Sequence, residues 1–488
     1  MRFRPPHVPL MPVSPAYRPA PQFAHLGPDH GDPVAPAAFP ATRLRFRNNR
    51  AAATVGLDGL TEAEWLTHFG RLQALPGQPG PIAMRYHGHQ FRTYNPDLGD
   101  GRGFLAAQLR ADDGRLLDLG TKGSGQTPWS RGADGRLTLK GGVREVLAAE
   151  MLEALGVPTS RAFSLIETGE ALQRGDEPSP TRSAVLVRLS HSHIRFGTFQ
   201  RAAWLQRTDM LAVLVEHVRS FYHPQVAEGD VPGLLAAVRD AAAYLAATWV
   251  AAGFVHGVLN TDNLNVTGES FDYGPWRFLP RYEPGFTAAY FDQFGLYAFA
   301  RQPEAVFWAL TQLAGALRPL APVEALMETL NGFGPAYIAA LRGAVLSRLG
   351  VLSAGAEADQ ALVDAALALL RQGGDALRWE PLFFDWFCGF SSAGRALAGP
   401  RGRLYQGRTF DAFRASLFDH APDRPERLEA PAFRADTPEE MLIDEVEAIW
   451  AAIDREDDWG LFEAKLLRLG AARDAYVLAP DARHRSEQ

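Results

Sequence analysis

Short β-like segments separated by glycine turns dominate residues 100–190 of the chain. GFLAAQLR and RLLDLGTK, joined by ADDG, predict a hairpin, and AFSLIE and SAVLVRL predict two further strands. From about residue 200 onward, apolar residues recur at helical spacing in runs such as EADQALVDAALALLRQ and EEMLIDEVEAIWAAID. A strand-rich first half followed by a helix-rich second half predicts an α+β fold. A protein-kinase-like bilobal fold is one option among several with this layout.

The same pattern divides the chain into three parts. Residues 1–40 are rich in proline and lack an uninterrupted apolar run, which indicates a flexible or extended segment and not a secretory signal. We expect residues 41–200 to form an N-lobe and residues 201–488 to form a helical C-lobe. The most apolar long stretch, 233–254, contains Arg239 and Asp240, and its helical spacing predicts a buried helix and not a membrane span.

Composition and charge narrow the range of partners. With 488 residues, 47% of them hydrophobic, the chain can bury a sizeable core. Its net charge of -7 argues against a general binder of nucleic acid or anionic membranes, so any phosphate binding must be local. The single cysteine, Cys388, cannot form an internal disulfide, which suits a reducing compartment, and we expect a cytoplasmic protein.

The segment HGVLNTDNLNVTGESFDYG, at 256–274, is similar to the catalytic loop of a protein kinase but lacks its base. Kinases have Asp two residues after the His, an Asn five residues further on, and then a D-F-G motif that holds metal. Here the position of the Asp is taken by Val258, while Asn263 and the Asp272-Tyr273-Gly274 triplet are present. The chain therefore keeps both metal-binding positions of a phosphoryl-transfer site without the usual base.

A lysine and a glutamate occur in the order that kinases use to bind phosphates. Lys122 closes the RLLDLGTK segment, and Glu145 lies in the first turn of a predicted helix, GGVREVLAAEMLEALG, that ends at Gly156. In kinases the equivalent lysine pairs with a glutamate on the following helix. A lysine at a strand end is also typical of a solvated edge, and a helix dipole favours an N-terminal Glu, so both interpretations stay open.

Loops and arginines around these positions are suited to bind an anion. In LGDGRG, at 98–103, the glycines let backbone N–H groups approach a phosphate beside Arg102. Arg188 alternates with Val187 and Leu189 along a predicted strand, so it lies on the opposite face, and Arg195 follows in HIRFG. Surface arginines are common, so none of these is specific alone. The two histidines of YHGHQF, His87 and His89, lack a clear third metal ligand, and we expect them to pack or anchor a loop.

Taken together, six sequence blocks resemble the selenoprotein O family. They are YHGHQF, LGDGRG, TKGSGQTPWSRGADGR, REVLAAEMLEALGVPTSRA, VRLSHSHIRFGTF and NTDNLNVTGESFDYGPWRFLPRYEPGF, in family order over roughly residues 80–350. The resemblance implies a kinase-like fold and a protein adenylyltransferase, which transfers AMP from ATP to Ser, Thr or Tyr hydroxyls of other proteins. It also implies that ATP binds flipped relative to kinases, so that the α-phosphate faces the acceptor and an Asp at position 258 would be misplaced.

The resemblance assigns a role to each candidate residue. Asp262 is the implied proton acceptor, Asn263 and Asp272 the implied Mg²⁺ ligands, with Mn²⁺ as an alternative metal, and Glu145 positions Lys122. The implied ATP-binding residues are Gly99, Gly101, Arg102, Lys122, Asp134, Gly135, Arg188, Arg195 and Asp272. In an isolated N-T-D-N segment, Asp262 would more simply cap a turn or orient Asn263.

Some positions depart from the family pattern. Arg92 replaces a usual Gly, and Gly141 and Gly142 replace two serines, which leaves the start of the predicted helix less well capped. Beyond about residue 400 the recognisable motifs fade, so we expect a variable C-terminal region there. The family's C-terminal cysteine or selenocysteine motif is absent, which argues against redox control of that kind.

Three classes of function remain open from the sequence. The first is protein nucleotidylation, by AMP from ATP or by UMP from UTP with Mn²⁺. The second is an ATP-dependent phosphotransferase, which Val258 opposes. The third is a catalytically silent pseudokinase scaffold, which the retained Asp262, Asn263 and Asp272 oppose. We expect protein substrates and ATP as partners, and no nucleic acid or membrane; the oligomeric state is left open.

Overall fold

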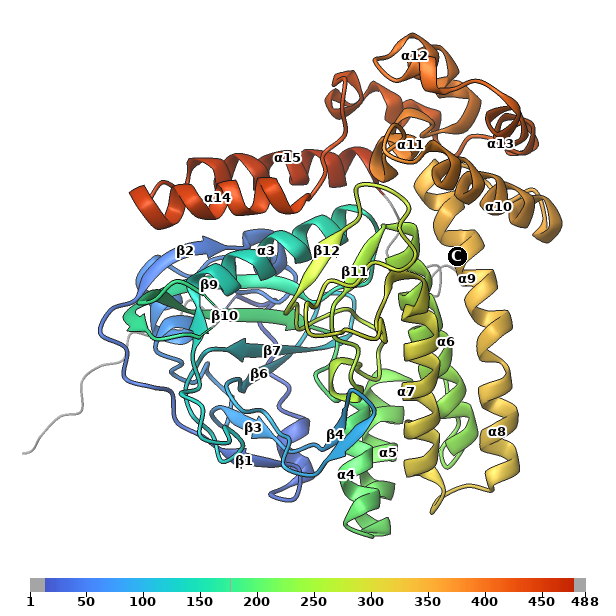
Figure 1. Cartoon of the computed structure of the whole chain (residues 1–488). Helices are drawn as coiled ribbons and strands as arrows, with labels where there is room; N and C mark the ends of the chain where they lie inside the picture. The colour runs from blue at the N-terminus through green and yellow to red at the C-terminus, as the bar shows by residue number, and fades with distance from the viewer. Residues whose placement is uncertain (1–13, 176, 478–488) are drawn as a thin grey trace, which may run out of the picture.

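The predicted strands of the first half form one eight-stranded antiparallel sheet. In the computed structural model, which describes residues 14–175 and 177–477, the strand order is β1-β3-β6-β7-β10-β9-β2, with β8 paired to β10 (Figure 1). The predicted hairpin is confirmed as β6 and β7, and the other two predicted strands are β9 and β10. The strands of the sheet are β1 (Gly31–Pro33), β2 (Arg43–Arg47), β3 (Ile82–Met84), β6 (Leu105–Arg110), β7 (Leu116–Lys122), β8 (Leu137–Thr138), β9 (Arg161–Leu172) and β10 (Thr181–Ser190).

The register of β7 and β10 sorts charged and apolar side chains onto opposite faces. Lys122 lies opposite Leu186, and Gly120 opposite Arg188, so both cations share one face of the sheet. Val187 and Leu189 point to the other face, where they pack into an apolar cluster with residues of the N-terminal segment. The alternation that the sequence indicated for Arg188 is thus confirmed.

Helix α3 (Leu139–Ala154) lies against the sheet and brings Glu145 to the face that carries the cations. Its apolar residues Val143, Val146 and Leu147 are fully buried. The prediction of a poorly capped start is wrong, because the helix begins before the two glycines and the Thr138 hydroxyl accepts a hydrogen bond from the Gly141 N–H (3.1 Å). The helix α15 (Gly460–Tyr476) and its neighbour α14 (Ile443–Glu456) lie along the outer side of α3 (Figure 1).

The second half is helical, as its apolar spacing predicts, and mixed α and β structure in this arrangement confirms the α+β class. The predicted buried helix is α6 (Val231–Ala251). It is long and apolar enough to cross a membrane, but 72% of its most apolar window is buried against the rest of the protein. Its neighbours and the remaining helices are α1 (Asn49–Ala53), α2 (Glu62–Trp65), α4 (Phe196–Trp204), α5 (Thr208–Tyr222), α7 (Gln302–Leu317), α8 (Val323–Asn331), α9 (Phe333–Leu349), α10 (Ala356–Gly373), α11 (Trp379–Asp385), α12 (Ala393–Ala398) and α13 (Arg408–Phe418).

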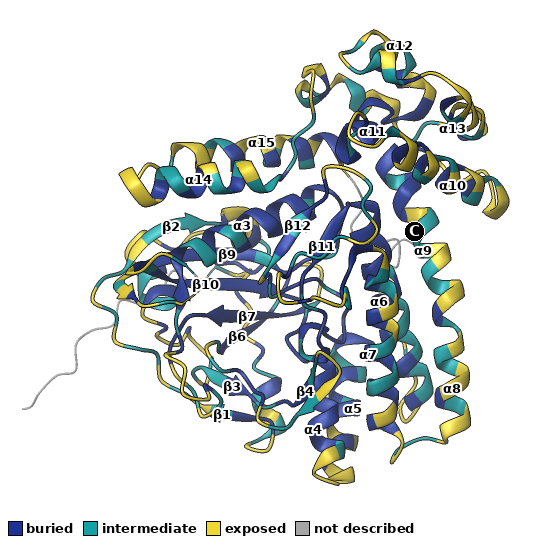
Figure 2. Cartoon of the chain, in the orientation of Figure 1, coloured by how far each residue is buried: buried dark blue, intermediate teal, exposed yellow. Residues whose placement is uncertain are grey.

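Residues 14–40 pack against the sheet and do not form the flexible segment that their proline content indicated. Strand β1 pairs with β3, and the rings of Tyr17 and Phe23 are buried. The few large apolar side chains between the prolines anchor this stretch, since each gains by leaving water. Residues 1–13 of the expected flexible segment lie outside the described residues. Burial is densest along the sheet, α3 and α6, while the outer helices expose one side (Figure 2).

Candidate active site

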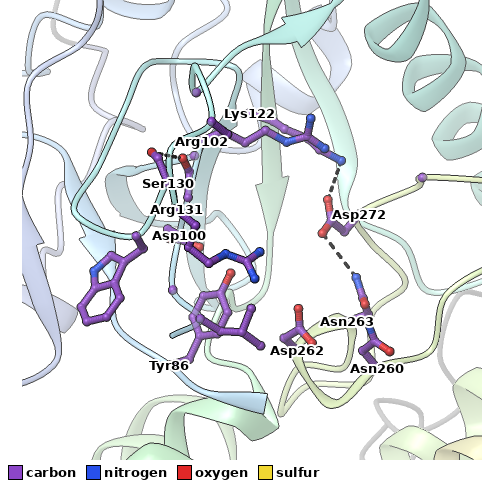
Figure 3. A pocket seen from close by; sticks show the side chains of 18 of the residues that line it. Tyr86, Asp100, Arg102, Lys122, Ser130, Arg131, Asn260, Asp262, Asn263 and Asp272 are labelled. Carbon is purple, nitrogen blue, oxygen red and sulfur yellow. Dashed lines mark hydrogen bonds and ion pairs between the residues drawn. The ribbon is translucent and has the colours of Figure 1, made fainter. Parts of the chain in front are cut away.

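A cavity of about 700 Å³ lies between the sheet and the helical half, and the sequence motifs converge on it (Figure 3). Strands β7 and β10, with the loops 98–103 and 123–136, form one wall, which we call the sheet wall, and the segment 258–274 forms the opposite wall. Of the predicted site residues, Glu145 alone is missing from the lining, because it lies behind Lys122. The predicted residues that line the cavity are Gly99, Gly101, Arg102, Lys122, Asp134, Gly135, Arg188, Arg195, Asp262, Asn263 and Asp272.

Lys122 connects the sheet, α3 and the segment that ends the catalytic-loop motif. Its Nζ donates to Glu145 and, at 2.5 Å, to the Asp272 carboxylate. Burial by itself would raise the pKa of Asp272, but the positive charges of Lys122 and Arg188 hold that pKa well below its ordinary value. Asp272 is therefore ionised at neutral pH, and the predicted pairing of Lys122 with Glu145 is present.

Two arginines that line the cavity are buried and carry donor groups without a hydrogen-bond partner among the described residues. Nε and Nη1 of Arg188 and Nε of Arg195 have no hydrogen-bond partner in the described part of the chain. The nearest anions to Arg188 are Asp272 and Glu145, at 3.5 and 3.7 Å, and Arg195 forms an ion pair with Asp100 at 3.0 Å. A buried guanidinium with unused N–H groups is poised to bind an anion such as a phosphate.

Asp262 lies on the opposite wall of the cavity, in the segment 258–274. It lies in a single 3-10 turn, Thr261–Asn263, that follows the short strand β11 (Phe254–His256). Its Oδ1 is buried and accepts no hydrogen bond within the described residues. Burial raises the pKa of Asp262 to about 6, with Arg195 partly opposing the shift. Val258 also lines the cavity, so the kinase base position is apolar here.

The turn that carries Asp262 is held by its neighbours, not through the carboxylate. The Thr261 hydroxyl donates to Gln200 Oε1 (2.8 Å) and accepts from the backbone N–H of His89 (2.8 Å). Gln200, on α4, also hydrogen-bonds Nδ1 of His89 (2.8 Å). His89 belongs to the small hairpin of β4 (Gly88–Gln90) and β5 (Thr93–Asn95), in which His87 hydrogen-bonds the Tyr94 hydroxyl (2.8 Å). The prediction that these histidines anchor a loop is confirmed.

The glycine loops have a packing role that the sequence did not indicate. A Cβ at Gly99 would lie 2.4 Å from the Trp129 ring, and Gly135 has φ +70° beside the backbone of Gly125. The Trp129 indole N–H donates to Asp32 (2.9 Å), which ties loop 123–136 to the N-terminal segment. Asp134 is exposed and accepts two hydrogen bonds from Arg174, at 2.8 and 3.2 Å.

Several cavity residues were missed by sequence reasoning. Tyr86 lies under the Arg195 guanidinium, 4.3 Å from its ring centroid, and Asp100 pairs with that arginine. Both stand within or beside quoted motifs, YHGHQF and LGDGRG, and adjacency to a motif was the available signal. Arg131, in the loop 123–136, also lines the cavity and faces Asp262 closely enough to lower its pKa.

The donor set suits a divalent cation that is shared with a substrate. Asn263 and Asp272 lie side by side, with Nδ2 of Asn263 3.3 Å from the Asp272 carboxylate, and both offer oxygen to the cavity. The described residues contain no group of three or more His, Cys, Asp or Glu placed to hold a metal. Mg²⁺ is commonly bound by one or two carboxylates together with substrate phosphates, so two protein ligands fit this cation better than a closed protein cage.

Buried cations with unused donors, in a cavity that also holds a carboxylate oxygen without a partner among the described residues, are suited to bind phosphates and to stabilise the charge that develops during transfer of a phosphorus-containing group. Comparison with known proteins gives the family. The family model of the protein adenylyltransferase SelO matches residues 15–469, so the chain belongs to this family and is a nucleotidyltransferase by family. The match continues past residue 400, where the recognisable motifs of the sequence end.

Relatives agree with this assignment. A protein nucleotidyltransferase YdiU of Gloeobacter violaceus is 46% identical over 472 residues, which are 94% of this chain and 95% of the relative. A protein of the same name from Synechococcus elongatus is 52% identical over 345 residues, 70% of this chain and 68% of the relative. The Synechocystis protein nucleotidyltransferase YdiU is 43% identical over 475 residues, 92% of this chain and 97% of the relative.

Proposed function

We propose that the protein transfers AMP from ATP to Ser, Thr or Tyr hydroxyls of other proteins and releases pyrophosphate. The observation that carries this proposal is the separation of charge across the cavity. Lys122, Arg188 and Arg195 bring three positive charges to the cavity, and Asp262, whose Oδ1 is buried without a hydrogen-bond partner among the described residues, lies on the wall formed by residues 258–274. A kinase-like base at residue 258 is replaced by Val, which argues against transfer of the terminal phosphate.

In the proposed reaction the acceptor hydroxyl gives its proton to Asp262 as its oxygen forms a bond to the α-phosphorus. The bond between that phosphorus and the oxygen bridging to the β-phosphate breaks, and its electron pair leaves with pyrophosphate. The unused donors of Arg188 and Arg195, with Lys122 held by Glu145, bind the β- and γ-phosphates and stabilise charge on the leaving group. The ATP lies flipped relative to a kinase substrate, with its α-phosphate toward Asp262.

Asp262 needs to be ionised to accept a proton, and its raised pKa makes it a better base than an exposed aspartate once ionised. With a pKa of about 6, it is largely ionised at pH 7 and protonated below pH 5. Asn263 and Asp272 would hold Mg²⁺, or Mn²⁺, against the phosphates. Such a cation supplies Lewis-acid neutralisation of phosphate charge when bound.

The same proposal includes the arrangement of the two lobes, the loops that bind the nucleotide and the location of the protein in the cell. The pairing of Lys122 with Glu145 and the position of Asp272 support a kinase-like arrangement of an N-lobe, residues 41–200, and a C-lobe, residues 201–488, whose catalytic loop is 256–274. The loops of the N-lobe would bind the nucleotide, through Gly99, Gly101, Arg102, Asp134 and Gly135 among others. A single cysteine supports a cytoplasmic location.

Labelled nucleotides test the reaction. The purified protein is incubated with Mg²⁺ and ATP that carries label on either the α- or the γ-phosphate, and protein-bound label is counted. We expect α-label on protein and γ-label in pyrophosphate. Protein-bound γ-label would establish a phosphotransferase instead, and no label on any protein, with binding of ATP intact, would establish a scaffold. UTP with Mn²⁺, tested in parallel, decides between adenylyl and uridylyl transfer.

A further inference from the structure

Four aromatic side chains form an exposed patch beside the cavity, which we name the aromatic rim: Phe91, Tyr290, Phe291 and Phe294. Phe294 is 92% exposed and Tyr290 84% exposed, while Phe291 and Phe91 are 46% and 37% exposed. Three of the rings are in contact, with centroids 5.8 Å apart for Phe91 and Phe291 and 5.1 Å apart for Tyr290 and Phe291, and Phe294 follows in the same loop. Contiguous exposed apolar surface of this kind marks an interaction site more often than isolated exposed side chains do.

The aromatic rim is connected directly to the turn that carries Asp262. The backbone N–H of Phe91 donates to Oδ1 of Asn260 (3.0 Å), and the Tyr297 hydroxyl donates to the same oxygen (2.8 Å). Asn260 lines the cavity two residues before Asp262, and Gln90, the neighbour of Phe91, lines it as well. The rim therefore borders the mouth of the cavity on the side of Asp262.

The exposed rings stand on a backbone that is fixed in place. The Asp292 carboxylate accepts hydrogen bonds from the backbone N–H groups of Leu296 (2.9 Å) and Tyr297 (2.8 Å). Arg301 donates to the Gly295 carbonyl (3.0 Å). Phe91 has φ +49°, a conformation that a large side chain adopts only where its surroundings hold it. A built loop that presents rings to solvent is suited to bind a partner.

Charge does not select the partner at this position. Arg92 and Arg301 both lie beside the Glu304 carboxylate, at 3.1 and 3.2 Å, and the Asp292 carboxylate also acts on Arg301, so two positive and two negative charges lie next to the rim. What remains available is the apolar face of the rings, which binds apolar and aromatic side chains best.

We infer that the aromatic rim binds the acceptor polypeptide, as an extended segment with a large apolar or aromatic side chain a few residues from the hydroxyl that is modified. This inference rests on the proposed function, because a hydroxyl that reaches Asp262 brings its flanking residues across the mouth of the cavity. An extended chain advances about 3.3 Å per residue, so the side chains that meet the rim lie within a few positions of the acceptor.

Peptide acceptors test the rim. Synthetic peptides carry one central Ser, Thr or Tyr and, at each flanking position in turn, Phe, Leu, Ser, Asp or Lys, and α-labelled ATP reports transfer. We expect the wild-type protein to favour Phe or Leu at one or two fixed positions, with kcat/KM about tenfold above the Ser peptides. Tyr290→Ser and Phe294→Ser remove that preference by raising KM for the apolar peptides, and leave kcat and the Kd for ATP unchanged.

A matched control and a second readout separate the possible outcomes. Phe418→Ser replaces a ring that is 74% exposed on α13, away from the cavity, and keeps the preference. Anisotropy of fluorescein-labelled peptides, measured with a non-hydrolysable ATP analogue, reports binding independently of transfer. Selective binding of apolar peptides that is lost in Phe294→Ser supports the rim as a peptide-binding surface even if no peptide is labelled, and transfer of α-label to protein then decides the proposed function separately.

Three results would overturn the inference. The first is transfer and binding without preference for apolar flanks, unchanged in both rim variants. The second is a weaker Kd for ATP in Tyr290→Ser or Phe294→Ser, which would assign the rings to the nucleobase. The third is a wild-type dimer that dissociates in these variants on sedimentation, which would assign the rim to a second copy of the chain.

Discussion

The two walls of the cavity handle buried charge in opposite ways. On the sheet wall, Lys122 is compensated by Glu145 and Asp272, and Arg195 by Asp100, so this wall forms a network of opposite charges. On the opposite wall, the Asp262 carboxylate has a buried oxygen with no partner, and its pKa is raised to about 6. The positive charges of the sheet wall hold the pKa of Asp272 well below its ordinary value, whereas burial raises the pKa of Asp262 to about 6.

This difference indicates that the two walls have different roles in the reaction. Groups that bind phosphates need a permanent charge, which opposite charges stabilise in a buried place. A group that accepts a proton needs a pKa near the working pH, which requires burial without strong partners. Changes on the sheet wall should therefore abolish binding and turnover together, and changes at Asp262 should affect turnover alone.

The largest effect is expected for Asp272→Asn, which removes the carboxylate of the 258–274 segment that compensates the cations of the sheet wall. The variant loses a carboxylate ligand for the cation and leaves Lys122 and Arg188 undercompensated. Loss of several kcal/mol of charge stabilisation corresponds to a decrease in kcat/KM of about 10³ to 10⁵. Label transfer at increasing Mg²⁺ concentrations measures it, and more Mg²⁺ should be needed for half-maximal activity. Asp113→Asn, at the exposed hairpin turn, is the control; equal losses in both variants would remove Asp272 from the site.

Asp262→Asn should come next and should separate the two walls. General-base catalysis contributes about 10² to 10⁴ in rate, so kcat falls by that order while the Kd for ATP stays within about twofold. In the wild-type protein kcat/KM should decrease below a pH of about 6, as Asp262 takes up its proton. That acidic limb should be absent from the residual activity of the variant. An unchanged rate, or a limb that persists, would assign the base elsewhere.

Thr261→Val should have a smaller effect, because Thr261 positions Asp262 and does not react. The change removes the hydroxyl that joins His89 and Gln200 to the turn. Loosening the turn should lower kcat about tenfold, since small misplacements of a catalytic group are costly in rate. Thr261→Ser restores the hydroxyl and should recover most of the rate. If the serine variant is as slow as the valine variant, packing of the methyl group matters instead, and the hydrogen bonds do not position the base.

The sheet wall was largely predictable from the sequence, because its parts follow short-range rules. Alternation placed Arg188 on the face opposite Val187 and Leu189, and the kinase-like order of Lys122 and Glu145 indicated their pairing, which is present; the shared face of Lys122 and Arg188 follows from the register of β7 and β10. Asp262 was assigned through the resemblance, since one Asp in a turn has no signal of its own. The start of α3 was misjudged because Thr138, three residues before Gly141, had not been considered as the cap.

The contacts that hold the turn of Asp262 were out of reach of sequence reasoning. Thr261 meets His89 across 172 positions of the chain and Gln200 across 61. Hydrogen bonds at such separations depend on how the β4–β5 hairpin and α4 pack together, which no local pattern encodes. Residues 14–40 were misjudged for a similar reason, because β1 (Gly31–Pro33) pairs with β3 (Ile82–Met84), a strand far along the chain that no local pattern indicates as its partner.

The smallest expected effect is on the thermal stability of the protein. It measures the free-energy cost of ionising the Asp262 carboxylate in the folded state. A carboxylate whose pKa is higher in the folded than in the unfolded protein makes folding less favourable as pH rises from about 4 to about 6, because the folded state holds its proton longer. Above pH 6 the penalty is complete, at most about 3 kcal/mol for a shift of about two pKa units. Asp262→Asn should therefore raise Tm at pH 7.5 and leave it unchanged at pH 4. The exposed Asp58→Asn should change neither, and a variant that is less stable than wild type at pH 7.5 would mean that the ionised carboxylate is satisfied within the fold.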